Sequence, residues 1–146
     1  MRVLITGGLG FIGGRLGHYL SESGVEVIIG TRKNDIKSPE WLPQSQVIQT
    51  KWDDLSSLEA ACNGIDVVVH AAGVNATDCA DNPVGALSVN GLSTANLLYC
   101  AISSGVKKFT YVSTGHVYKK HLQGELTETN SPENLHPYAS SHRAGE

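Results

Sequence analysis

Residues 7–14 contain five glycines, and this loop constrains the fold more than any other feature of the chain. It follows the β-branched run Val3–Ile5 and precedes a helical apolar pattern that starts near Ile12. Gly8, Gly10 and Gly13 form a GxGxxG pattern, in which missing side chains allow a tight turn and a close backbone approach to phosphates. The helix N-terminus adds N–H donors and a positive dipole end. The pattern predicts a phosphate-binding turn, and a glycine-rich turn that binds nothing is the alternative.

Strand and helix patterns alternate along the rest of the chain. We expect strands at 3–5, 25–29, 46–50, 66–70 and 109–113. We expect helices from 12 to Gly24, from a capping box at Ser56 and Glu59 to 63–64, from the Asp81-Asn82-Pro83 cap to about 104, and from Pro137 onward. Residues 114–136 are expected to form a loop. This alternation predicts an α/β fold with one doubly wound parallel sheet, in a single domain over 1–146.

The composition excludes several classes of partner. The net charge is −3 and no cluster of Lys and Arg is present, so we expect no nucleic-acid binding. No apolar run reaches the roughly 20 residues of a membrane span. The three cysteines have no CxxC spacing and indicate reduced thiols, hence a cytoplasmic protein. His116 and His121 do not form a ligand pattern with nearby carboxylates or thiols, so no metal site is predicted.

Several motifs occur in an order that resembles one family. They are TGGLGFIGG at 6–14, HAAG at 70–73, Asn90, YVST at 111–114 with Val117-Tyr118, and PYASSH with AGE between 137 and 146. Together they resemble the N-terminal portion of the extended short-chain dehydrogenases/reductases, the NAD-dependent epimerase/dehydratase family. The resemblance implies a Rossmann-type doubly wound parallel sheet, incomplete at its C-terminal side. It also implies a set of cofactor-binding residues, namely Gly7, Gly10, Phe11, Ile12, Ala71, Ala72, Gly73 and Asn90.

The end of the second strand bears on which nicotinamide cofactor is used. NAD-using members of the family have an Asp there that bonds the ribose 2′-hydroxyl, whereas Thr31 occupies this position here and Arg32 follows. A missing carboxylate removes repulsion against a 2′-phosphate, and a guanidinium can bind it bidentately. We therefore expect NADP, with NAD as the possible alternative. The family carboxylate that contacts adenine corresponds to Asp53 or Asp54; Asp53 fits the spacing better, and the other would lead into the helix.

The resemblance also implies a catalytic set. Tyr138 corresponds to the family acid/base, Thr114 to the hydroxyl that binds the substrate oxygen, and Ser113 is the neighbour that could replace it. The family has a Lys four residues after the Tyr, one helical turn away, where its ammonium lowers the phenol pKa. His142 stands at that position and is mostly uncharged at neutral pH. Three interpretations follow. The enzyme is active with an acidic pH optimum, a lysine from elsewhere takes the place of the missing one, or the active site is degenerate.

These features together predict an enzyme. It would transfer hydride between NADP or NAD and a small-molecule substrate, a sugar-nucleotide-like or small carbonyl or alcohol compound, with net epimerisation, dehydration or reduction. A non-catalytic NADP-binding sensor or partner-binding protein is the alternative, because of His142. The resemblance further implies a possible homodimer through the helix at 83–104 and the Tyr138 helix.

Overall fold

The computed structural model describes residues 1–34 and 36–146. These residues form two compact units, one made of 1–72 and 95–112 and the other of 73–94 and 113–146. Among the described residues, no helix is both long enough and apolar enough to cross a membrane.

The first unit is built on a five-stranded parallel sheet with the strand order β3-β2-β1-β4-β5. The strands are β1 (Arg2–Thr6), β2 (Glu26–Thr31), β3 (Gln46–Gln49), β4 (Val67–His70) and β5 (Lys108–Tyr111). Thr6 at the end of β1 pairs with Gly30 of β2 and with His70 of β4, so three strands finish side by side. The predicted doubly wound parallel sheet is confirmed, with strand ends within about two residues of expectation.

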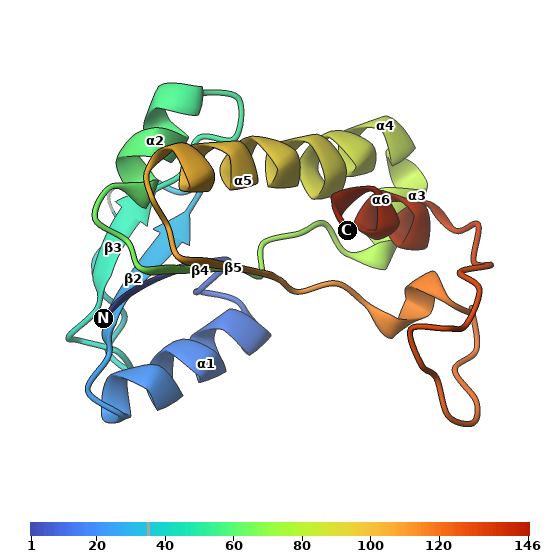
Figure 1. Ribbon diagram of the computed structural model, residues 1–146, viewed down its shortest axis with the longest axis horizontal. Coiled ribbons are helices and arrows are strands. Elements are labelled where there is room, and N and C mark those ends of the chain that lie inside the picture. Colours follow the sequence, from blue (N-terminus) through green and yellow to red (C-terminus); the bar gives the residue numbers. More distant parts are fainter. Residues whose placement is uncertain (35) are drawn as a thin grey trace. The chain divides into compact units, whose positions relative to one another are not determined.

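Helices cover both faces of this sheet (Figure 1). Helix α1 (Phe11–Glu22) covers one face, and α2 (Leu55–Cys62) and α5 (Ser93–Ser103) cover the other. Successive strand residues point to opposite faces, so Leu4 packs with Leu58 and Leu97 while its neighbour Ile5 joins the opposite cluster. Burial on both faces explains why the cores of the three inner strands, β1, β2 and β4, are apolar throughout. The edge strands β3 and β5 are only partly buried.

Helix α2 begins differently from the prediction. Its N-cap is Asp54, whose carboxylate accepts the backbone N–H of Ser57 at 3.2 Å, and Ser56 lies inside the first turn. The predicted capping box at Ser56 and Glu59 is therefore wrong. The physical reason is that a carboxylate two residues earlier already satisfies the exposed N–H groups and complements the helix dipole.

The second unit is mostly helical. It contains α3 (Ala76–Asp81), α4 (Pro83–Ala86), a π-helical segment η1 (Leu87–Leu92), a 3₁₀ turn η2 (Gly115–Val117) and α6 (Pro137–Gly145). Asn82 caps α4 by accepting the Gly85 N–H at 2.9 Å, as the sequence predicted. The helix expected over 83–104 is formed by α4, η1 and α5 in direct succession along the chain, and the π-helical stretch within it was not predicted. Helix α3 and turn η2 were not predicted.

Candidate cofactor and active site

The turn after β1 depends on Gly7. This residue has φ +69°, and its N–H donates to the Gly30 carbonyl at 3.2 Å. A Cβ at Gly7 would lie 2.7 Å from both the Ala71 carbonyl oxygen and the Ala72 nitrogen. Only glycine therefore allows the turn to lie against the residues that follow β4. The residue with positive φ is one position before the first glycine of the GxGxxG pattern.

Gly10 and Gly13 leave the N-terminus of α1 accessible to an anion. A Cβ at Gly13 would lie 2.5 Å from the Gly7 carbonyl oxygen, so this glycine brings the helix against the turn. Gly10 is the N-cap residue, and no side chain of the described residues caps this end of the helix. Phe11 and Ile12, the first two residues of the helix, are 79% and 58% exposed. Uncapped N–H groups at a positive dipole end fit the diphosphate of a dinucleotide.

Thr6 and His70 join the ends of β1 and β4. The Thr6 hydroxyl lies 2.5 Å from Nδ1 of His70 and also accepts the Ala72 N–H at 3.4 Å. The imidazole is buried, with the Trp52 and Tyr111 rings 5.4 and 5.6 Å away between centroids. This arrangement holds the Ala71-Ala72 segment beside the glycine turn.

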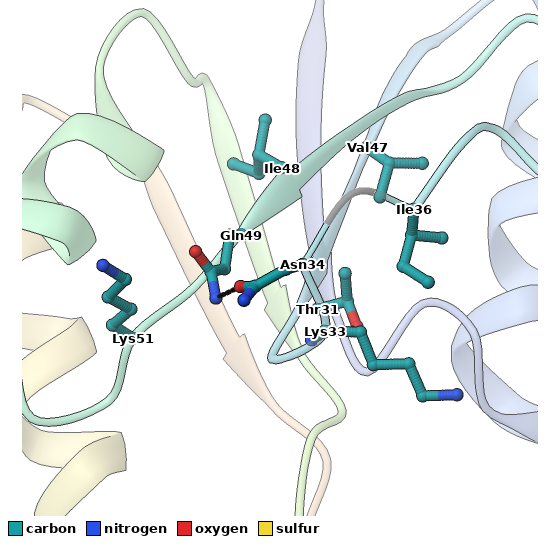
Figure 2. A pocket seen from close by; sticks show the side chains of 8 residues that line it. All are labelled: Thr31, Lys33, Asn34, Ile36, Val47, Ile48, Gln49 and Lys51. Atoms are coloured by element: carbon teal, nitrogen blue, oxygen red, sulfur yellow. Dashed lines mark hydrogen bonds between the residues drawn. The ribbon is translucent and has the colours of Figure 1, made fainter.

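A polar pocket of about 510 Å³ lies at the ends of β2 and β3 (Figure 2). Thr31 lines it, as does Lys51, which the sequence reasoning missed. The hydrogen bond from the Ser56 hydroxyl, followed by that from the Ser57 N–H, lowers the pKa of Asp54, whose carboxylate serves as the α2 cap. Asp53 thus remains the carboxylate predicted to contact adenine. A signal for Lys51 did exist, because Lys51 follows Gln49, the last residue of β3, by two positions.

In the second unit, Asn90 links three segments. Its side-chain oxygen accepts the Val74 N–H at 2.9 Å, and its amide donates to the Ser141 hydroxyl at 3.0 Å. It is 1% exposed. A Cβ at Gly73 would lie 3.2 Å from the Asn90 oxygen, so Gly73 permits a close approach. The structure thus gives Asn90 a positioning role between the chain after β4, η1 and α6, while its contact with a cofactor stays a prediction.

Tyr138 and His142 lie one turn apart on α6. Their rings meet edge to face with centroids 4.6 Å apart. His142 is 6% exposed, and this burial lowers its pKa, an effect that the Glu146 carboxylate partly opposes. The imidazole is therefore neutral at pH 7 and lacks the positive charge with which an ammonium would stabilise a phenolate.

The two candidate hydroxyl groups have different partners. The Thr114 oxygen accepts the His116 N–H at 3.2 Å as the cap of η2, which leaves its hydrogen to be donated. The Ser113 hydroxyl donates to the side-chain carboxylate of Glu146. Thr114 is therefore better suited than Ser113 to donate a hydrogen bond to a substrate oxygen.

A second pocket, of about 150 Å³, borders Tyr138 and was not predicted. His116, Lys120 and His136 contribute to its wall. The pocket forms because the chain before α6 folds back onto η2, where the Asn134 amide donates to the His116 carbonyl at 2.8 Å. This long-range contact has no local sequence signal.

The lowered pKa of His142 predicts a pH dependence of stability. Because the folded state holds this proton more weakly than the unfolded chain does, the unfolded chain binds more protons as the pH falls below about 6.5. The contribution of His142 to the free energy of unfolding is therefore fully retained above that pH and falls as the pH decreases toward the lowered pKa. Urea unfolding at about pH 7.5 and about pH 5.5 should show a larger loss for the wild type than for His142→Gln. Equal losses would contradict this assignment.

Comparison with known proteins decides the family. The NAD-dependent epimerase/dehydratase family matches the chain over residues 3–146. The chain belongs to this family. Family membership agrees with the parallel sheet and with the glycine turn at its carboxyl edge.

Individual relatives differ in what they act on. The 3 beta-hydroxysteroid dehydrogenase/Delta 5→4-isomerase of Mycobacterium tuberculosis is 36% identical over 126 residues, covering 80% of this chain and 32% of that protein. Mouse dTDP-D-glucose 4,6-dehydratase is 32% identical over 156 residues, covering 99% of this chain and 44% of the relative. The structure of Thermus thermophilus UDP-glucose 4-epimerase complexed with NAD has a TM-score of 0.87 at 32% identity, covering 99% of this chain and 48% of that one. The chain thus spans about a third to a half of the length of these relatives.

Proposed function

We propose that the chain is the dinucleotide-binding portion of an NAD(P)-dependent oxidoreductase, epimerase or dehydratase. The observation that carries this proposal is the bare N-terminus of α1, with the Gly7 turn held against β4 and no side chain of the described residues capping it. Such a terminus supplies backbone donors and dipole for a diphosphate, and it has no structural purpose when left open.

The cofactor we propose is NADP. Thr31 at the end of β2 places a hydroxyl where a carboxylate would repel a 2′-phosphate, and the exposed Arg32 follows it. NAD is bound in the related epimerase structure, and it remains the alternative here.

The nicotinamide ring supplies the hydride chemistry when bound. The residues of the chain would supply proton transfer and orientation. Tyr138 exchanges the proton of the substrate hydroxyl, and Thr114 donates a hydrogen bond to the same oxygen. Neutral His142 packs against the Tyr138 ring and orients it without contributing charge.

The substrate we propose is a small molecule with a carbonyl or secondary alcohol, of the sugar-nucleotide kind.

We further propose a homodimer formed through α5, because Leu98, Tyr99 and Ile102 of that helix are 39%, 61% and 69% exposed. All three cysteines are unpaired, which supports a cytoplasmic location.

A non-catalytic NADP-binding sensor is the second candidate, and the neutral His142 favours it. Turnover separates the two. We expect product analysis to show conversion when the chain is incubated with cofactor and UDP-glucose, dTDP-glucose or a 3β-hydroxysteroid. A net change at the reduced-nicotinamide band is expected only for net oxidation or reduction, because epimerisation and dehydration regenerate the cofactor. A chain that binds cofactor tightly but changes none of these substrates, by absorbance or by product analysis, would favour the sensor.

A further inference from the structure

The flank of α1 carries a groove that the proposed function leaves unexplained. Its volume is about 600 Å³, within the range of about 300–1,000 Å³ that is typical of small-molecule pockets. One wall is a stripe of side chains along α1, and the other comes from the loop between β2 and β3. The side chains that carry its chemistry are those of Phe11, Arg15, His18, Tyr19, Glu22 and Trp41.

Close packing of the β2–β3 loop against α1 forms the groove. A Cβ at Gly14 would lie 3.1 Å from the Trp41 ring, and one at Gly17 would lie 3.3 Å from Leu42, so both glycines let the loop approach the helix. Leu42 is buried, and its carbonyl accepts the N–H and the hydroxyl of Ser45 at 3.1 and 2.8 Å. Trp41 is thus anchored before any ligand arrives, which lowers the entropic cost of binding.

Three aromatic rings in this groove are exposed to solvent. Phe11 and Tyr19 come from the same stripe of α1, and Trp41 comes from the loop. Exposed apolar groups that gather in one hollow are typical of a binding surface. Aromatic rings pack favourably with other flat rings, either offset or edge to face, so these three side chains favour a ligand with an aromatic body.

Arg15 supplies a positive charge at one end of the groove. Its guanidinium carbon lies over the Phe11 ring, 5.4 Å from the centroid. A guanidinium held over a ring keeps N–H groups available for a carboxylate. Arg15 forms no ion pair with any residue that the structure describes, whereas the Glu22 carboxylate, about two turns along the helix, lies 3.4 Å from the His18 ring nitrogen. An anionic group is therefore favoured at the Arg15 end.

We propose that this groove binds a planar aromatic carboxylate, with its rings against Tyr19 and Trp41 and its carboxylate on Arg15. This binding would be independent of the proposed function. Of the described lining residues, Gly10 and Phe11 alone are also predicted to bind the cofactor. A diphosphate at the N-terminus of α1 uses backbone N–H groups, whereas the groove uses side chains. The aromatic ligand and a dinucleotide should therefore bind together.

The test compares 2-naphthoate with 2-naphthamide, which share a ring system and differ in charge. Calorimetric titration of the purified chain gives the two affinities, and we expect naphthoate to bind at least about fivefold more tightly. Arg15→Met should remove this preference. Lys108→Met, an equal loss of charge at the amino end of β5, should keep it. Tyr19→Ser should weaken both ligands by the same factor, because it removes a ring and no charge.

NMR spectra of the indole N–H groups locate the bound ligand. The chain has two tryptophans, and Trp52 packs against the buried His70 ring, with centroids 5.4 Å apart. We expect naphthoate to shift the Trp41 resonance, identified by its loss in Trp41→Phe, and to leave that of Trp52 in place. Saturating ADP-ribose should not change the affinity for naphthoate.

The outcomes separate this inference from the proposed function. Absence of naphthoate binding, equal binding of the two naphthyl ligands, or a preference that survives Arg15→Met would overturn the groove as a binding site. Displacement of naphthoate by ADP-ribose would also overturn it, because the ligand would then lie in the dinucleotide site. A folded chain that binds naphthoate as expected but does not bind ADP-ribose would contradict the proposed function alone.

Discussion

Replacing Gly7 by alanine should lower the free energy of unfolding by about 3 kcal/mol or more. The residue has φ +69°, where an L side chain costs about 1–2 kcal/mol. Its Cβ would also lie 2.7 Å from backbone atoms of Ala71 and Ala72, which cannot rotate away as a flexible side chain would. Forced overpacking of this kind adds about 1–3 kcal/mol. Urea unfolding of the variant gives the measurement.

Gly24 offers a matched control in the same unit. It has φ +77°, and an added Cβ would have no described atom within 4 Å. Gly24→Ala therefore carries the backbone strain without the clash, and we expect a loss of only about 1–2 kcal/mol. Equal losses in the two variants would mean that the turn does not lie against the end of β4 as the structure shows.

Replacing Tyr138 by phenylalanine should lower kcat by about three orders of magnitude, within the range measured for general acid–base groups. The variant keeps the ring and hence the contact with His142, whose centroid lies 4.6 Å away, so α6 should keep its packing. Only proton exchange with the substrate oxygen is lost. The measurement is kcat with whichever substrate proves active, together with the affinity for NADPH, which should not change.

Tyr118→Phe removes the same hydroxyl from a tyrosine that lies just after η2. We expect its kcat to stay within about twofold of the wild type, because Tyr118 has no assigned role in proton transfer. Equal kcat values for the wild type and Tyr138→Phe would remove Tyr138 from the mechanism. An equally large loss in Tyr118→Phe would mean that the loss in Tyr138→Phe is not specific to proton transfer, and it would contradict the assignment of Tyr138.

The parts of the fold that local sequence encodes could be predicted. The cores of β1, β2 and β4 are apolar runs, and the glycine turn follows the first of them directly, so their positions need no knowledge of distant contacts. The pairing of Tyr138 with His142 also follows from their spacing of four residues on one helix. The burial of His142, which keeps its imidazole neutral, could be seen only in the structure.

Features that depend on tertiary contacts could not be predicted. The π-helical segment Leu87–Leu92 contains Asn90, whose side chain bonds Val74 and Ser141, and Gly91, where a Cβ would meet Ala144 at 3.2 Å. Those partners lie far away in sequence, and only their combination explains why the helix widens there.

The pocket at Lys51 was missed for a different reason. The adjacent pair Asp53 and Asp54 left the register after β3 open until the cap of α2 was seen.

Titration of the folded chain with NADPH and with NADH tests the central claim most directly. The glycine turn, the open N-terminus of α1 and the end of β2 at Thr31 together predict that NADPH binds and that it binds at least about tenfold more tightly than NADH. Circular dichroism would first establish that the chain is folded. A folded chain that binds neither dinucleotide would contradict the account of the site, and one that prefers NADH would contradict the assignment of the cofactor.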